Sequence, residues 1–550
     1  MDMRGKNSIN LGSELHERYI HTGNVADLEA AITCFQEALR FYTPKTAPLE
    51  YARAQTSLGT TYKNLPGGDR QTNLKRAIAC YEAALQVYMR EAFPVEWATT
   101  QNNLGEAYQD LPGGDRQANL QQAIACYQSA LEVYTREAFP VAWARTQNNL
   151  GAAYQDLPGG NRVANLEAAI TAFQQALQAI PPDSPGRPAL LSNLGSGLRT
   201  RYEYTGNLAD LETAITAFQQ ALEATSLDSP NRPAQLSNLG VGLHDRYARA
   251  GDPADLEMAI TAFQQALEAT SSDSPTQAAQ LSNLASLYAD QGKYEQAEPL
   301  LLHALTIREQ QFGSTHPDTA TTLSNLASLY AEQGKYEQAE VLYQRTLTIR
   351  EEVLGPQHPD MAITLSNLAS LYAEQGKYEQ AEVLYQRALT IREEVLGPQH
   401  PDTATTLSNL ASLYVNQGKH EQALSLYEQA LLLMRGVGDR SREATILNNL
   451  AAIHQDIGQP QEALTLYEQA LLLMREVGDR AGEAATLNNL AVLCQSAGRL
   501  ERALSLYEQA LLLMRGVGDR AGEATILNNL AAVSQSKNKI VSFTQEQQES

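Results

Sequence analysis

The segment LSNLASLYAEQGKYEQAEVLYQR occupies residues 323–345, and the same 23 letters return unchanged at residues 365–387. A chain that repeats a segment in this way builds its fold from one unit used many times, so the repetition decides the fold class. The triplet Asn-Leu-Ala inside the segment, or a close relative of it, recurs along the whole chain. Its leucine, called the anchor leucine below, falls at Leu11, Leu58, Leu104, Leu150, Leu194, Leu239, Leu284, Leu326, Leu368, Leu410, Leu450, Leu490 and Leu530.

Each unit reads as two helices. Around Leu368, the residues Leu365 and Leu371 complete an apolar stripe at helical spacing. Gly376 is well placed to end this helix in the left-handed conformation, and a second stripe begins at Ala381. Thirteen anchors whose spacing shrinks from 47 to 40 residues indicate one architecture from end to end.

The repeats differ in length along the chain. From the anchor leucine to the first alanine of the second helix, the later repeats use 13 residues and the first six use 19 or 20. We expect the extra residues to lie in long turns, written LPGGDRQANL or TGNLADLE. This pattern predicts an N-terminal block at residues 1–275, a block of 42-residue repeats at 276–437, and a block of 40-residue repeats at 438–538. The last block ends in a polar capping helix, which a solenoid needs, and a disordered tail is expected at 539–550.

These residues carry a resemblance to a known family. An anchor leucine, a small residue after it, Tyr four positions on, a glycine turn and then Ala-x-x-x-Tyr-x-x-Ala resemble the tetratricopeptide repeat (TPR). Residues 375–411 are similar to the 42-residue repeats of kinesin light chains and related bacterial proteins. Residues 111–151, 205–240 and 463–491 resemble the sensor arrays of bacterial proteins that carry a caspase-like (CHAT) effector. The resemblance implies an all-α, right-handed α-solenoid of about twelve helical hairpins with a C-terminal capping helix.

Composition narrows the function classes. The formal net charge of −22 argues against a nucleic acid partner, because binding to a polyanion needs a basic footprint. The first residues lack the apolar core of a signal peptide, and no apolar run approaches the length of a membrane span. Four cysteines make no disulfide framework in a chain of 550 residues. We therefore expect a cytoplasmic protein that binds neither nucleic acid nor membrane.

Catalytic and metal-binding chemistry finds little support. Cys34, Cys80 and Cys126 hold equivalent positions beside core aromatic residues, and Cys494 stands where another repeat has a core tyrosine, so all four are expected in the core. No glycine-rich phosphate loop is present. We expect no catalytic residue, no metal and no cofactor.

Three histidines recur in His-Pro-Asp turns 42 residues apart: His316, His358 and His400. Adjacent repeats hold them too far apart to share one metal ion, so a role in the turn is favoured. Within these turns, Asp360 or Asp402 is expected to cap the following helix.

One polar residue recurs more regularly than any other. The residue before the anchor leucine is Asn in twelve of thirteen units, although Asn costs about 0.5 kcal/mol relative to Ala inside a helix. Two compensations stay open. Each Asn could bond a neighbouring helix as a structural ladder, or it could contact a ligand.

The TPR resemblance implies that the first helices line a concave groove, where such asparagines clamp a peptide backbone. The predicted groove residues are Asn283, Asn325, Asn367, Asn409, Asn449, Asn489, Ser324, Ser366, Ser408, Ser370, Glu332 and Glu374. If the acids line the groove, they favour basic partner segments, although a role as ordinary solvated surface is equally open.

These observations predict a non-enzymatic scaffold or adaptor that binds a protein or peptide segment in the groove. Two alternatives stay open. One is a sensor arm that regulates a separately encoded, CHAT-like effector, and the other is a self-associating structural rod. The sequence leaves the oligomeric state undetermined.

Overall fold

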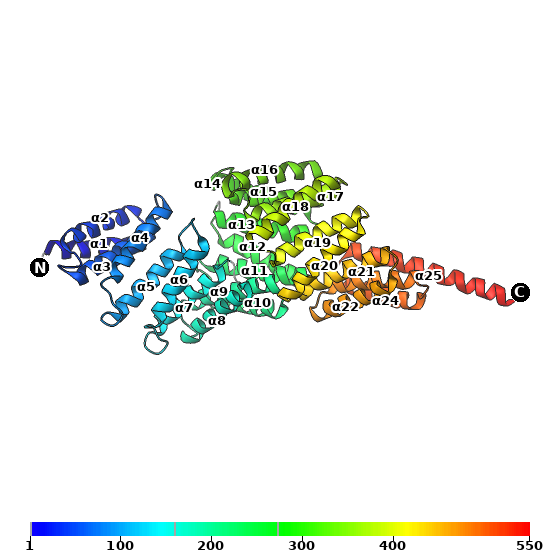
Figure 1. Ribbon diagram of the computed structural model, residues 1–550, viewed down its shortest axis with the longest axis horizontal. Helices are drawn as coiled ribbons and strands as arrows, with labels where there is room; N and C mark the ends of the chain where they lie inside the picture. Colours follow the sequence, from blue (N-terminus) through cyan, green and yellow to red (C-terminus); the bar gives the residue numbers. More distant parts are fainter. Residues whose placement is uncertain (1–2, 159–160, 272–273, 550) are drawn as a thin grey trace. The chain divides into compact units, whose positions relative to one another are not determined.

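The computed structural model describes residues 3–158, 161–271 and 274–549, and within these ranges it contains twenty-five α-helices and no strand (Figure 1). The first helices of the repeats are α1 (Met3–Thr22), α3 (Pro48–Asn64), α5 (Pro94–Gln109), α7 (Pro140–Asp156), α9 (Arg187–Thr205), α11 (Arg232–Ala250), α13 (Pro275–Asp290), α15 (Pro317–Glu332), α17 (Pro359–Glu374), α19 (Pro401–Asn416), α21 (Arg440–Asp456) and α23 (Arg480–Ser496). The second helices are α2 (Val25–Phe41), α4 (Arg70–Leu85), α6 (Arg116–Leu131), α8 (Arg162–Ala179), α10 (Leu208–Glu223), α12 (Pro253–Ala269), α14 (Tyr294–Phe312), α16 (Tyr336–Leu354), α18 (Tyr378–Val395), α20 (His420–Val437), α22 (Pro460–Glu476) and α24 (Leu500–Val517). With the terminal α25 (Arg520–Glu549), this confirms the predicted twelve helical hairpins and a final single helix.

The helices form two compact units. Unit 1 comprises residues 1–198 and unit 2 comprises residues 199–550, so the boundary falls inside α9. This boundary differs from the positions near residues 275 and 437 where the repeat length changes. The three blocks predicted from repeat length therefore describe the sequence and are not compact units. Residues 272–273, at the first of these changes, lie outside the described residues.

Each hairpin is held by a small set of buried side chains. In the repeat of α17 and α18, Leu368 and Ala369 of the first helix pack with Tyr385 of the second. Burying a leucine side chain stabilises the fold by about 2 kcal/mol, and the alanine lets the two helices approach closely. Gly376 ends α17 with a φ of +72°, which confirms the left-handed turn expected there.

Several repeats of unit 1 carry glycine where α17 has Ala369, and an aromatic ring of the second helix lies against that glycine. A Cβ atom on Gly105 would lie 2.7 Å from the ring of Tyr127. The ring of Tyr127 therefore leaves no room for the alanine of NLA at this anchor, and the sequence is NLG.

The long turns are only partly as expected. Between α5 and α6, residues 110–115 form the predicted loop around LPGGDR. In the TGNLADLE repeats, however, only Gly206 and Asn207 separate α9 from α10. The extra residues lengthen the helices instead, since Gly206 ends one helix in the left-handed conformation and the Asn207 side chain caps the next at once.

The C-terminal segment also differs from the expectation. Residues 539–549, expected to form a disordered tail, continue α25 as helix. No glycine or proline follows Gly522 to stop the helix, and Gln and Glu are good helix formers. Within the described residues, none of the helices is long and apolar enough to cross a membrane.

Within each unit, the first helices lie on the inner side of the curved stack. Neighbouring first helices contact each other, as α13 does α15 and α15 does α17. Within the described residues, neighbouring second helices contact each other less than neighbouring first helices do. This asymmetry bends each stack toward its first helices, which is where the predicted groove residues are found.

Candidate protein-binding face

The six predicted asparagines of unit 2 occupy one equivalent position on successive first helices. Asn283, Asn325, Asn367, Asn409, Asn449 and Asn489 lie on α13, α15, α17, α19, α21 and α23 and are half-buried. The anchor leucine after each of them is buried. We call these six side chains the asparagine row. They lie where the hydrophobic core meets the inner surface.

The last two members of the row are bonded within the protein. The amide nitrogen of Asn449 donates to the Tyr427 hydroxyl at 3.3 Å, and that of Asn489 donates to Asn448 Oδ1 at 3.3 Å. The same ladder continues in α25, where Asn529 donates to Asn488 Oδ1 at 3.0 Å. This part of the row has the structural role.

The first four members are different. The side-chain amides of Asn283, Asn325, Asn367 and Asn409 form no hydrogen bond within the residues that the structure describes. Because these side chains are only half-buried, both amide functions remain open to the inner surface. Four consecutive repeats thus present the donor and acceptor pair that matches a peptide bond.

The residue before the asparagine of the preceding repeat explains much of the difference. In NNL repeats, the preceding Asn accepts a hydrogen bond from the asparagine of the next repeat. Asn193, for example, donates to Asn148 Oδ1 at 2.7 Å. In SNL repeats the serine bonds its own helix, as Ser366 and Ser408 do by donating to the carbonyls four residues earlier. The next asparagine is then left without this acceptor.

The predicted serines are less available than the amides. Ser324 and Ser366 are buried and Ser408 is half-buried. Ser370 lies 2.7 Å from the hydroxyl of Tyr385, a contact that ties the first helix of the hairpin to the second. Their role in ligand binding stays a prediction.

An acidic cavity of about 260 Å³ lies between α13 and α15. Asn325, Asp290 and Glu332 contribute its polar groups, and Leu301 and Leu329 are among its apolar walls. Partial burial raises the pKa of Glu332, and the nearby charge of Asp290 raises it further. Two like charges therefore share one cavity.

Only one of these acids has a basic partner. His244 Nε2 lies 2.6 Å from Asp290 Oδ2. Glu332 and the equivalent Glu374 of the next repeat form no ion pair within the described residues. The cavity thus holds a carboxylate that no protein cation neutralises.

A second cavity of about 210 Å³ lies between α19 and α21. Asn409 and Asn449 line it together with Ser408 and Arg442. The Arg442 guanidinium bonds Asp439 at 3.0 Å, so its charge is already paired. Both cavities lie along the asparagine row.

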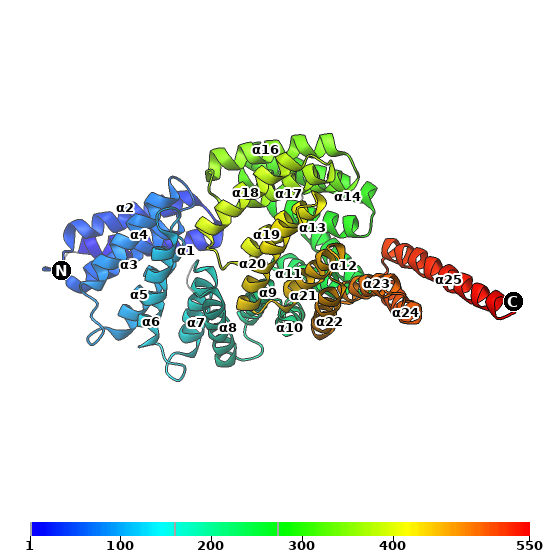
Figure 2. The ribbon, with the colours of Figure 1, turned by 45° about the vertical axis from the view of Figure 1, so that its right-hand side comes forward.

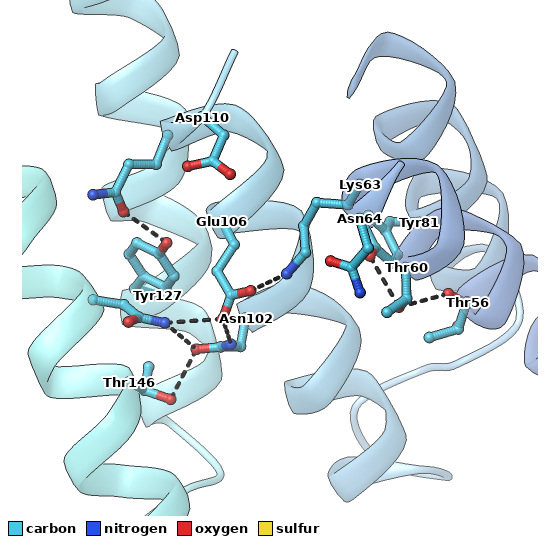
Figure 3. Close-up of polar contacts among 12 residues, drawn as sticks. Thr56, Thr60, Lys63, Asn64, Tyr81, Asn102, Glu106, Asp110, Tyr127 and Thr146 are labelled. Carbon is cyan, nitrogen blue, oxygen red and sulfur yellow. Dashed lines mark hydrogen bonds and ion pairs between the residues drawn. The ribbon is translucent and has the colours of Figure 1, made fainter. Parts of the chain in front are cut away.

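In unit 1 the corresponding surface is bonded to itself (Figure 3). Glu106 accepts from Asn102 at 2.8 Å and from Asn149 at 3.0 Å, and it also pairs with Lys63. Thr146 donates to Asn102 Oδ1 at 3.1 Å. Glu106 was not among the residues predicted from the sequence. The signal was its place two residues after an anchor leucine, where the 42-residue repeats have serine.

The remaining chemical candidates have structural roles. Cys126 and Cys494 are buried as predicted, whereas Cys34 and Cys80 are half-buried. Burial raises the pKa of Cys80 to about 12 and, with a smaller effect from Glu82, that of Cys126 to about 12, which opposes thiolate formation. Among the described residues, no group of His, Cys, Asp and Glu could hold a metal ion.

The three histidines occupy turns, as predicted, and they also cap helices. The Nδ1 atom of each histidine accepts from the backbone N–H of the aspartate two residues later, at 3.2 Å in all three repeats. The expectation that Asp360 and Asp402 cap the helices was wrong. The proline at the first helical position places the histidine, and not the aspartate, at the N-cap.

Comparison with known families agrees with this architecture. Tetratricopeptide repeat profiles match residues 276–352, 322–394, 360–435, 442–515 and 483–539, and a second such profile matches residues 408–472. These segments run together, so residues 276–539 belong to the tetratricopeptide repeat family. Repeat arrays of this kind generally mediate contacts between proteins. A comparison with curated proteins finds no match.

Solved structures of similar arrays are known. BtubC (BKLC) from P. vanneervenii is 24% identical with a TM-score of 0.34, over 46% of this chain and 92% of that one. The nearly identical TPR-like repeats described for a kinesin light chain of P. anserina are 23% identical with a TM-score of 0.31, over 38% of this chain and 97% of that one. Similarity at this level gives no information on ligands or partners.

Proposed function

We propose that the chain is a non-enzymatic scaffold that binds an extended peptide segment along the first helices of unit 2. The observation that carries this proposal is the set of four consecutive open amides, Asn283, Asn325, Asn367 and Asn409. An amide side chain offers one donor and one acceptor group, so a row of them can bond successive peptide groups of a ligand with little dependence on its sequence.

The acidic cavity supplies a preference for the ligand side chain. Glu332 is unpaired, and Asp290 on the facing helix carries the same charge. A lysine or arginine side chain of the ligand would neutralise the pair, while the apolar walls at Leu301 and Leu329 suit its methylene stem. The ligand we propose is therefore a protein segment with a basic residue.

A peptide-display selection on the immobilised full chain tests this function. Selected peptides should carry Lys or Arg at one fixed position. Asn325→Ala, Asn367→Ala and Asn409→Ala in one chain should weaken them at least tenfold, and Glu332→Gln should remove the basic preference. The matched control is Asn489→Ala with Asn529→Ala, which changes the same position where the amide is already bonded. Equal affinity of the triple variant and the wild type would contradict the proposal.

The two alternative functions give other results. A structural rod predicts a mass that rises with concentration in light scattering. A sensor arm predicts binding to an effector with a His/Cys protease-like domain, and the resemblance of residues 111–151 and 205–240 to CHAT-associated arrays is its support.

A further inference from the structure

Two stretches of unit 2 that are far apart in the sequence lie side by side. Helix α11 contacts α23. Figures 1 and 2 both show α10 and α11 alongside α20, α21 and α22. The stack of helices therefore completes one superhelical turn between α11 and α23. The edge of the stack at α11 meets the edge at α23. We call this contact the seam.

The seam has a polar centre. Arg249, at the end of α11, donates from Nη1 to the Ser441 hydroxyl, although the two residues are 192 positions apart. The same nitrogen lies 3.7 Å from Asp479 Oδ2. At the margin, the rings of Tyr204 and His400 meet edge to face with centroids 5.4 Å apart.

Two glycines bring the edges into close contact. A Cβ atom on Gly206 would lie 2.7 Å from Asp439 Oδ1, and one on Gly251 would lie 2.6 Å from Val517 Cγ1. Gly334 ends a first helix with nearly the same φ, +71° against +67° at Gly251, but has nothing within 4 Å. The close approach at Gly251 is therefore due to the seam and not to the left-handed glycine turn at the helix end.

The polar centre is incompletely satisfied. Arg249 is 9% exposed, and its Nε and Nη2 atoms are buried without a hydrogen-bond partner among the described residues. The two seam acids named above already cap helices: Asp479 accepts from the Gly482 N–H at 2.7 Å, and Asp439 accepts from the Ser441 and Arg442 N–H groups. A buried charge with unmet hydrogen bonds opposes closure. The seam is thus closed but weakly held compared with the repeats that it joins.

We propose that the seam is a latch that controls access to the asparagine row. The first helices lie on the inner side of the turn, so closure encloses their surface. An extended chain must then enter through an end of the turn or wait until the seam opens. This inference rests on the proposed function for the identity of the ligand, but its test needs no ligand.

The first test asks whether the seam exists in solution and can be opened. Gly251→Ala adds a methyl group against Val517, and Arg249→Glu places a carboxylate beside Asp479. Hydrogen exchange of the full chain should become several-fold faster at residues 437–440, 477–480 and 517–520 in both variants. Gly334→Ala carries the same backbone strain and should leave these turns unchanged. If both seam variants exchange these amide hydrogens at the wild-type rate, the proposal is overturned.

The second test asks whether the latch controls access. Asn325→Cys places a thiol on the row, and mass spectrometry of that peptide measures its reaction with a small maleimide and with a polymer-linked maleimide. Gly251→Ala should raise the rate of reaction with the polymer-linked maleimide several-fold. The rate with the small maleimide should change little. The seam variants could show faster hydrogen exchange at the turns and an unchanged rate of reaction with the polymer-linked maleimide. The seam would then open without controlling access to the row, and the proposal would fail. Peptide selection on the wild type would still decide the proposed function independently.

Discussion

The residue before the asparagine of one repeat sets whether the asparagine of the next repeat finds an Asn acceptor there. Where the preceding residue is Asn, as at Asn488, it accepts a hydrogen bond from the next repeat, here from Asn529. Where it is serine, as at Ser366, the hydroxyl donates to Ala362 of its own helix, and this acceptor is missing for the next amide. Asn409 then stays open, whereas Asn449, which follows Ser408, donates to the Tyr427 hydroxyl instead. The NNL and SNL triplets therefore differ in whether they offer the next repeat's asparagine a side-chain acceptor.

This difference predicts opposite effects of the same substitution. Asn489→Ala removes a hydrogen bond to Asn448, worth about 1 kcal/mol, and should destabilise its repeat. Asn325→Ala removes no hydrogen bond to any described residue and replaces a poor helix former, so it should stabilise its helix by about 0.5 kcal/mol. Hydrogen exchange of α23 and of α15 measures both locally. Equal destabilisation would show that Asn325 has a structural partner.

The acidic cavity predicts a pH-dependent effect. The pKa of Glu332 is raised in the folded protein, by burial first and by Asp290 second, so its ionised form lowers stability above that pKa. Glu332→Gln should therefore raise the melting temperature at pH 7. The gain should shrink toward pH 4, near the ordinary glutamate pKa of about 4.3, where the wild-type carboxyl becomes neutral. Scans of both proteins across this range test the sign, and a loss of stability at pH 7 would contradict it.

At the scale of the element, helix ends are set by short local signals. Pro359 begins α17, and His358 caps it through Nδ1. Gly376 closes the helix in the left-handed conformation. Each hairpin is thus specified within its own repeat, which is why the helices could be located from the sequence.

The histidine cap can be tested by two substitutions. His358→Ala leaves the N–H of Asp360 without its acceptor and should cost about 1 kcal/mol. His358→Asn supplies a side-chain oxygen at the same place and should keep the stability of the wild type. Hydrogen exchange at the start of α17 distinguishes the variants, and similar protection in both would show that the cap contributes nothing.

At the scale of the whole unit, a stack of repeats needs a covered end. Val533 and Ile526 of α25 are buried with the side chains of α23 and α24, so this helix closes the core of unit 2. Because repeats contact mainly their neighbours, damage there should stay local.

Val533→Asp buries an unpaired charge and should expose the end of the core. We expect faster hydrogen exchange throughout α24 and α25 and no change in α13–α16. Gln535→Asp, at an exposed position of the same helix, is the control and should behave as the wild type. A uniform change across unit 2 would show that its repeats unfold as one body.

The sequence by itself determined the helical hairpins, their number, the position of the asparagine row and the anchor leucines, which are buried except at the two ends, Leu11 and Leu530. These features depend on contacts within one repeat or between neighbours, so each copy of Asn-Leu-Ala carries the information again. Local signals were less informative where two were adjacent, as at Gly206-Asn207, where a helix end and a helix start left no room for the expected long turn.

Only the tertiary structure decided which asparagine amides stay open and where the array meets itself. The acceptor for one asparagine belongs to the repeat before it, so its state depends on a pair of repeats. The contact of Arg249 with Ser441 depends on the small rotations added by every repeat between them. No single repeat contains that sum, and this is the physical reason that the seam could not be predicted from the repeating unit.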